Sequence, residues 1–178
     1  MKQRNARAIL LLLGLGFAGG AQALSSDRDQ PLTIEADTVE INDKSGVSVY
    51  QGHVVVVQGT LELKGSTVTI YSPKREVDKV VAEGNPARYK QRPDNKTEDV
   101  RAKAQRMEYY ADKGTLILLE GGHLWQGKDE FSGNRIEYDT RRDVVNASMS
   151  STGKERVRII MQPRDRTAPD SSAPAVTP

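Results

Sequence analysis

The sequence predicts an all-β fold in which short strands are stacked in two similar units around one core. Apolar and polar residues alternate along short segments, which is typical of half-buried strands. The chain also nearly repeats itself at an offset of 68 residues, and a fixed period of this kind indicates stacked supersecondary units. The repeat relates three glycines of one half to three of the other, Gly46, Gly59 and Gly65 to Gly114, Gly127 and Gly133.

The first 23 residues have the organisation of a secretory signal peptide. Lys2, Arg4 and Arg7 give a positive start, residues 9–18 are apolar, and Ala-Gln-Ala at 21–23 is a small-x-small cleavage site. We therefore expect residues 1–23 to be removed and the chain to be exported to the periplasm. An uncleaved anchor is the alternative, although the apolar run is short for a membrane span.

Charge and cysteine content restrict the function classes. The whole chain has 26 Lys and Arg against 24 Asp and Glu, but three of the basic residues lie in the signal segment. Without it the balance is 23 to 24, so the alkaline pI of about 8.8 is no argument for nucleic-acid binding. Cys is absent, so the chain has neither disulfides nor a thiol nucleophile.

The mature chain divides into one domain, residues 24–162, and a tail, residues 163–178. The tail is rich in Pro, Ser, Thr and Ala, and we expect it to be disordered. Within the domain, apolar alternation predicts strands around residues 32–36, 39–41, 47–49, 61–63 and 68–70 and again in the second half. The last expected strands are 144–149 and 157–161.

Turn signals separate these strands. In the first half they are residues 42–46, 51–52, 58–59, 64–65 and 72–73, and in the second half 111–114, 121–122, 126–127 and 132–133. Glycines spaced six to seven residues apart leave no room for helices. Residues 99–110 have mixed propensity, so a helix is possible there. Their repeat partner, residues 35–42, looks extended, which argues against a helix. The polar segment 88–101 is expected to form a protruding hairpin or loop.

Two apolar runs, residues 54–57 and 116–119, do not alternate. A strand that is apolar on both faces is either covered on both faces, as in a central sandwich strand, or meets a ligand or partner on one of them. Both interpretations remain open from these residues alone.

The sequence carries no recognisable catalytic motif, and we expect a protein that is not an enzyme and uses no cofactor or metal. His53 and His123 each follow glycine-containing segments and suggest a shared structural position, without metal-ligand spacing around either. Carboxylates are plentiful, but they lie at polar strand positions or in turns, where solvation explains them. A glycosidase with paired carboxylates is the enzymatic alternative. The interior positions are mostly aliphatic, which suits hydrocarbon chains.

The order of several short motifs resembles the OstA-like family of lipopolysaccharide export proteins. These motifs are Pro-Leu-Thr-Ile-Glu-Ala-Asp at 31–37, Tyr-Gln-Gly-His-Val at 50–54, Leu-Lys-Gly-Ser-Thr-Val at 63–68, Gly-Asn-Pro-Ala at 84–87 and Ala-Lys-Ala at 102–104. The resemblance covers about residues 29–162. His53 stands where the family often has Asn, and Gly65-Ser66 replaces an Ala-Asp pair.

The resemblance implies an OstA-like β-jellyroll of repeated short antiparallel strands, open at both ends. It implies that lipid A acyl chains of lipopolysaccharide bind in the interior, and that copies of the chain dock head to tail. It further implies docking with an LptC-like protein at the inner membrane and an LptD-like protein at the outer membrane. A bridge across the periplasm that serves outer-membrane assembly follows from these contacts.

We predict that inward-facing apolar positions line the lipid groove, although each of them could equally well only pack the core. They are Leu32, Ile34, Ala36, Val39, Ile41, Val49, Val56, Leu61, Leu63, Val68, Ile70, Tyr89, Met107, Tyr109, Leu116, Leu118, Phe131, Ile136 and Tyr138. The sequence shows no polar cap at either end of the domain, so we predict partner edges at Leu32, Ile34, Val157, Ile159 and Met161. The competing class is a structural or interaction scaffold of the cell envelope without a ligand.

Overall fold

The structure is a computed structural model that describes residues 27–93, 96–149 and 156–163. The signal segment and nearly all of the predicted tail lie outside the described residues. The described residues form one short 3₁₀ helix and ten strands: η1 (Asp27–Asp29), β1 (Leu32–Glu35), β2 (Thr38–Asn42), β3 (Val47–Gln58), β4 (Leu61–Tyr71), β5 (Lys79–Gln91), β6 (Val100–Tyr110), β7 (Thr115–Gln126), β8 (Asp129–Asp139), β9 (Val144–Ser148) and β10 (Arg158–Ile160).

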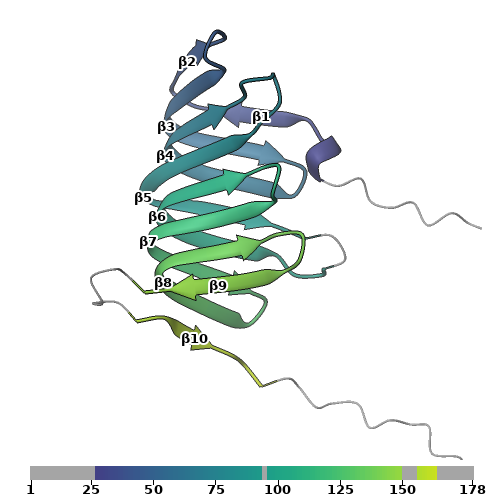
Figure 1. The fold of residues 1–178 in the computed structure, drawn as a ribbon, viewed down its shortest axis with the longest axis vertical. Helices are drawn as coiled ribbons and strands as arrows, with labels where there is room; N and C mark the ends of the chain where they lie inside the picture. Colours follow the sequence, from purple (N-terminus) through teal and green to yellow (C-terminus); the bar gives the residue numbers. More distant parts are fainter. Residues whose placement is uncertain (1–26, 94–95, 150–155, 164–178) are drawn as a thin grey trace, which may run out of the picture.

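All ten strands belong to one antiparallel sheet whose neighbours follow chain order, so the fold is all-β as predicted. β1 and β2 both pair with β3 at one end, and β9 and β10 both pair with β8 at the other. Figure 1 shows the strands stacked in two layers from β2 at one end to β10 at the other. In the described part of the chain, the first and last strands do not pair with each other, so the sheet is not closed.

Each long strand is bent near its middle, where the pairing register shifts between neighbouring strands. In β3 the shift falls at Gly52 and His53, which both have left-handed φ angles of 78° and 45°. The register shift leaves one more residue on β3 than on β4 at this point. An extra residue on one strand of a pair bends that strand and increases its twist. The bend lets one strand contribute to both layers of the stack.

The 68-residue repeat is confirmed in the backbone. β7 and β8 begin and end 68 residues after β3 and β4. Each residue with a left-handed φ in the first half has a left-handed partner 68 positions later: Gly46 and Gly114, Gly52 and Glu120, His53 and Gly121, Gly59 and Gly127, Arg75 and Asp143. The repeat therefore preserves backbone conformation even where the residue type changes.

The strands are longer than predicted, because four expected turns lie inside strands. The segments 51–52, 64–65, 121–122 and 132–133 fall within β3, β4, β7 and β8. They lie in or beside the register shifts, so glycine bends the strand there and does not end it. The expected protrusion at 88–101 is also shorter, because β5 runs to Gln91 and β6 starts at Val100.

The core lies between the two layers and consists of the inward residues of the long strands. Val68, Leu118, Leu124 and Ile136 have no exposed surface, and Met107 and Tyr138 are 1 % exposed. The apolar run 54–57 is not covered on both faces, because Val54 and Val56 are buried while Val57 is 37 % exposed. Residues 116–119 follow the same pattern, with Leu116 and Leu118 buried and their neighbours only partly so.

Candidate binding groove

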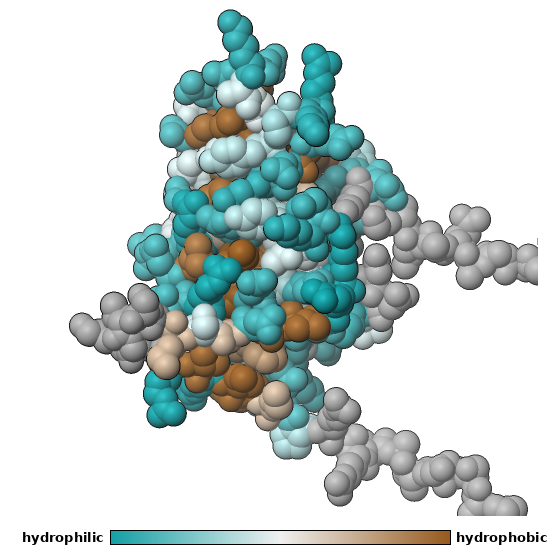
Figure 2. Space-filling model, viewed as in Figure 1, coloured by the Kyte–Doolittle hydropathy of each residue, from teal (hydrophilic) through white to brown (hydrophobic). Residues whose placement is uncertain are grey.

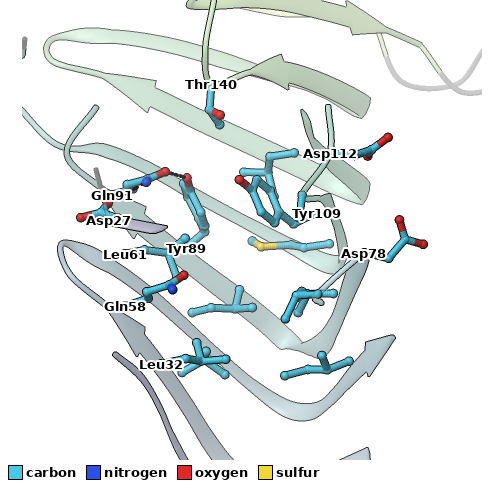
Figure 3. Close-up of a pocket in the computed structure, with 18 of the residues that line it drawn as sticks. Asp27, Leu32, Gln58, Leu61, Asp78, Tyr89, Gln91, Tyr109, Asp112 and Thr140 are labelled. Atoms are coloured by element: carbon cyan, nitrogen blue, oxygen red, sulfur yellow. Dashed lines mark hydrogen bonds between the residues drawn. The ribbon is translucent and has the colours of Figure 1, made fainter. Parts of the chain in front are cut away.

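A groove of about 1190 Å³ opens between the two layers along the side of the stack that carries the turns. Its walls are apolar side chains from β1, β3, β4, β5, β6 and β7, and Figure 3 shows Leu32, Leu61, Tyr89 and Tyr109 among them. Because alternate residues of a strand point to opposite faces, the inward set of every strand adds to the same wall. The apolar part of the groove wall is therefore continuous from strand to strand.

Polar turns border the groove on both sides. The first rim consists of the β3–β4, β5–β6 and β7–β8 connections, and the second rim consists of the β4–β5, β6–β7 and β8–β9 connections. Figure 3 shows Asp27, Gln58 and Gln91 on one side of the groove and Asp78 and Asp112 on the other. An amphipathic ligand would meet apolar walls inside and polar groups at the mouth.

Asp27 organises the first rim. Its carboxylate accepts hydrogen bonds from the Thr60 backbone N–H at 2.7 Å, the Thr60 hydroxyl at 2.8 Å and the Gln91 amide at 2.7 Å. Gln91 in turn accepts a hydrogen bond from the Tyr89 hydroxyl, drawn in Figure 3. Burial raises the pKa of Tyr89 well above its ordinary value, so this hydroxyl stays neutral inside the apolar wall.

In the second half of the stack, hydrogen bonds between the two rims close the mouth of the groove. Asp143 on the second rim accepts hydrogen bonds from Lys96 Nζ at 2.6 Å and Gln126 Nε2 at 2.7 Å, both on the first rim. It also accepts one from the Tyr138 hydroxyl at 3.0 Å. The bond from Lys96 holds the pKa of Asp143 below its usual value, while burial raises the pKa of Tyr138. The groove is thus closed at Asp143 and open beside β3 to β6.

Nine of the nineteen predicted groove residues line this cavity: Leu32, Val56, Leu61, Leu63, Ile70, Tyr89, Met107, Tyr109 and Leu116. Six more pack in the core that continues from it: Ile34, Val68, Leu118, Phe131, Ile136 and Tyr138. These two groups face the same interior.

The other four predicted residues lie elsewhere. Val39 and Ile41 point inward from β2, at the end of the stack, and are mostly exposed. Ala36 lies between β1 and β2 and is exposed. Val49 faces away from the interior, because it pairs with Thr69 while its neighbour Tyr50 pairs with the buried Val68. The prediction that Val49 lines the groove was wrong: β3 keeps its alternation through the bend, so its inward residues are Tyr50, Val54 and Val56, and Val49 lies on the opposite face.

Sequence reasoning missed Val80, Gln91 and Asp143. Val80 lines the cavity opposite Ile70, its pairing partner in β4. The apolar run at 80–82 could have revealed it, had it been read as the next strand of the stack. Asp143 looks like any polar turn residue in the sequence, and its role follows only from the distance between the two rims.

Both ends of the stack expose apolar residues that point into the interior. At the first end these are Leu32, Val39 and Ile41, and at the other it is Ile159, with exposed fractions from 42 to 60 %. Met161, just beyond β10, is 69 % exposed. The other predicted edge residues, Ile34 and Val157, are half-buried. Figure 2 shows apolar side chains gathered at the end that carries β9 and β10. Among the described residues, no further strand covers β2 or β10.

The two histidines do not share a structural position, contrary to the prediction. The repeat partner of His53 is Gly121, whereas His123 lies in the straight part of β7 and pairs with Ser132. His53 Nδ1 lies 2.8 Å from Asp37 Oδ2, and His123 Nδ1 lies 3.2 Å from Glu130 Oε1. Within the described ranges, no group of three His or carboxylate residues is arranged to hold a metal ion.

No helix of the described residues is long and apolar enough to cross a membrane. The described helical content is the three-residue η1 beside the first rim.

Three comparisons place this geometry among known proteins. The family model described as "LptA/(LptD N-terminal domain) LPS transport protein" matches residues 33–144. The lipopolysaccharide export system protein LptH of Pseudomonas aeruginosa is 35 % identical over 172 residues, which is 92 % of this chain and 98 % of LptH. The export system protein LptA of Escherichia coli strain K12 is 31 % identical over 145 residues, 80 % of this chain and 77 % of LptA.

The fold comparison agrees. The crystal structure of LptH, the LptA-homologous periplasmic component of the lipopolysaccharide transport device of Pseudomonas aeruginosa, matches with a TM-score of 0.72. That match has 35 % sequence identity and covers 78 % of this chain and 99 % of LptH. The OstA-like resemblance is thereby confirmed, and the chain belongs to the LptA/LptD N-terminal domain family of lipopolysaccharide transport proteins.

Proposed function

We propose that the mature chain is a periplasmic lipopolysaccharide carrier that holds lipid A acyl chains in the groove and joins its neighbours end to end. The observation that carries the proposal is the open apolar groove between polar rims, which reaches the exposed Leu32 at the first end of the stack. The packed core continues from it toward the other end, where Ile159 is exposed. The relatives that match over most of the chain are components of lipopolysaccharide export systems, which supports this choice of ligand.

The groove suits a ligand that must move on. Each buried methylene contributes about 0.8 kcal/mol, so an acyl chain enclosed in one deep pocket would leave very slowly. A wall of aliphatic residues repeated from strand to strand offers a nearly constant environment, so sliding along it changes the free energy little. Directed movement then depends on energy supplied by another protein.

The exposed ends suit strand addition. β2 and β10 each offer an unpaired edge among the described residues, and such edges accept a strand from a neighbour. Joining one end to the opposite end of another copy is a heterologous contact, which produces an open filament. An LptC-like protein at one end and an LptD-like protein at the other would complete a bridge between the two membranes.

Photo-crosslinking in cells tests the ligand. A crosslinking residue at Tyr109, which lines the groove and is half-buried, should give a lipopolysaccharide adduct. The same residue at Val49, which faces outward from β3, is the matched control and should give none. Equal adducts at both positions, or none at Tyr109, would overturn the groove assignment and favour a scaffold without a ligand.

A further inference from the structure

The outer surface of the sheet carries an unbalanced basic area on the side of the first rim. On β4 to β6 its members are Lys64, Arg88, Lys90, Arg101 and Lys103, with Glu62 as the acidic member. Together with Trp125 these residues line a shallow depression of about 410 Å³. We call these five cations the outer basic face.

The strand register places these cations directly opposite one another. Lys64 pairs with Arg88, and Arg88 pairs with Lys103, so three cations form one row across three adjacent strands. Lys90 and Arg101 pair in the next row. Directly opposite side chains have Cβ atoms about 4.5–5.5 Å apart, and like charges at that separation are destabilising. The arrangement has a cost in stability that an anion between the rows would remove.

The protein neutralises this charge only in part. Lys64 Nζ lies 2.8 Å from a Glu62 carboxylate oxygen, and Lys90 Nζ lies 3.4 Å from an Asp99 carboxylate oxygen. Asp99 also forms an ion pair with Arg92 at 2.9 Å, so it is shared between two cations. Lys103 Nζ lies 5.5 Å from the centre of the Trp125 ring. Among the described residues, no carboxylate lies within ion-pair distance of Arg88 or Arg101, and both side chains are exposed.

The other half of the same strands shows that this imbalance is local. Beyond the bend, the outward charges of β5 and β6 are Lys79, Glu83, Arg106 and Glu108, two of each sign. They pair with one another: Lys79 with Glu108 at 2.9 Å, and Arg106 with both Glu83 and Glu108. Paired charges of both signs are sufficient to keep a sheet surface soluble, so solubility alone does not account for the excess of cations on the outer basic face.

The outer basic face adjoins the mouth of the groove. Tyr89 and Gln91 line the groove, while Lys90 between them points to the outer surface. Lys90 and Arg101 are each one residue from the end of their strand at the first rim. Arg88 and Lys103 lie two residues farther along, about 7 Å at the usual strand rise. A ligand whose chains lie in the groove and whose head crosses the first rim therefore reaches these cations directly.

Building on the proposed function, we propose that the outer basic face binds the phosphorylated sugar head of the lipopolysaccharide whose acyl chains occupy the groove. Arg88 and Arg101 have guanidinium groups suited to bidentate contact with phosphate. The head is thus held outside the wall while the chains remain inside it, which sets the orientation of the lipid in the carrier.

Equilibrium binding to the purified mature chain tests this assignment. The variant R88Q/R101Q removes two cations from the face, and K44Q/R158Q removes two exposed cations that belong to neither rim, one in the turn between β2 and β3 and one on β10. We expect R88Q/R101Q to weaken lipopolysaccharide binding about tenfold and to reduce its salt dependence, as expected for lost charge-assisted contacts. The control should change the affinity less than twofold.

Three further ligands distinguish the source of the anion. Lipopolysaccharide stripped of its phosphates should bind the wild-type protein and R88Q/R101Q equally. Inorganic phosphate and phosphatidylglycerol vesicles should bind far more weakly than lipopolysaccharide, because they lack either the chains or the sugar head. Tight vesicle binding that R88Q/R101Q abolishes would assign the face to a membrane surface and overturn the proposal.

Two other outcomes separate this inference from the function on which it rests. If the wild-type protein binds intact lipopolysaccharide but R88Q/R101Q binds it equally well, the head-group site is wrong and the groove stands. If the wild-type protein binds neither form of lipopolysaccharide, both proposals fail. Thermal unfolding provides a check on folding: R88Q/R101Q should be at least as stable as wild type, since it relieves like-charge contacts.

Discussion

Arg75 and Asp143 lie 68 residues apart and share a left-handed backbone, with φ angles of 62° and 58°. The same left-handed position thus carries an exposed cation in one half and, in the other, a carboxylate that joins the two rims. The repeat supplies the backbone position, and the residue type decides whether the groove is tied shut there.

The rim contact predicts unequal effects of one substitution at these two positions. Asp143→Asn keeps a residue that tolerates left-handed φ but loses the charge that Lys96 contacts, and we expect it to lower the free energy of unfolding by about 1–2 kcal/mol. The expected loss of stability is small because the Lys96 and Asp143 side chains are partly open to solvent, which screens their ion pair. Arg75→Asn is the matched control, with a change below about 0.5 kcal/mol. Urea denaturation measures both, and equal effects would show that Asp143 does not tie the rims.

The ion pairs around Glu108 predict an acid-dependent stability. Burial raises the pKa of Glu108, but hydrogen bonds from Lys79, Arg106 and Tyr110 outweigh it and lower the pKa to about 2. Because the folded pKa lies below the unfolded one, this stabilisation is complete above about pH 4.5 and is lost as the pH falls toward 2.

Glu108→Gln should therefore lower stability at pH 7 by about 1–2 kcal/mol, after allowance for solvent around the basic partners. It should have a smaller effect near pH 2, where the wild-type carboxylate is itself becoming protonated. Thermal unfolding followed from pH 7 to pH 2 measures this convergence. Curves for wild type and variant that stay parallel through this range would contradict the charge assignment.

Glycine at 46 is required for space as well as for φ. A Cβ at Gly46 would lie 2.6 Å from the Cα of Pro73 in the facing turn, whereas one at Gly121 would meet nothing within 4 Å. Both glycines have left-handed φ angles, 65° and 74°. Gly121→Ala should cost about 1 kcal/mol for backbone conformation alone. Gly46→Ala should cost at least about 1 kcal/mol more, since two backbone segments must move apart. Equal midpoints in urea would contradict this difference.

The exposed ends predict head-to-tail assembly that complementary variants can dissect. Ile41 is 60 % exposed at the β2 end and Ile159 is 49 % exposed at the β10 end. Ile41→Lys and Ile159→Lys should each abolish concentration-dependent oligomers, because a charge buried in an apolar contact is unfavourable. Both variants should keep wild-type stability, since neither position is buried in the monomer.

An equimolar mixture of these two variants should form dimers and nothing larger, because one intact β10 end then meets one intact β2 end. Light scattering with analytical ultracentrifugation measures the masses. Dimers formed by one variant alone would show a symmetric contact between like ends, and oligomers unaffected by either lysine would count against docking through these ends.

The sequence alone determined the all-β class, the 68-residue repeat and most of the interior. Apolar alternation and glycine spacing are local properties of the chain, so residues such as Leu63, Val68 and Ile136 could be assigned to the inner face without coordinates. The same local view failed at Gly65 and Gly133, which were expected in turns, because a bend within a strand and a turn between strands use similar residues.

Only the tertiary structure decided which residues meet across the stack. β3 runs through its bend as one strand and keeps its alternation, so Val49 lies on the face opposite Tyr50, Val54 and Val56. The closeness of two rims far apart in sequence gives Asp143 its partners. The rows of the outer basic face depend on the register of three strands, which no single segment encodes. The repeated sequence thus fixes a repeated backbone, while pairing register decides where the groove opens and where its charge gathers.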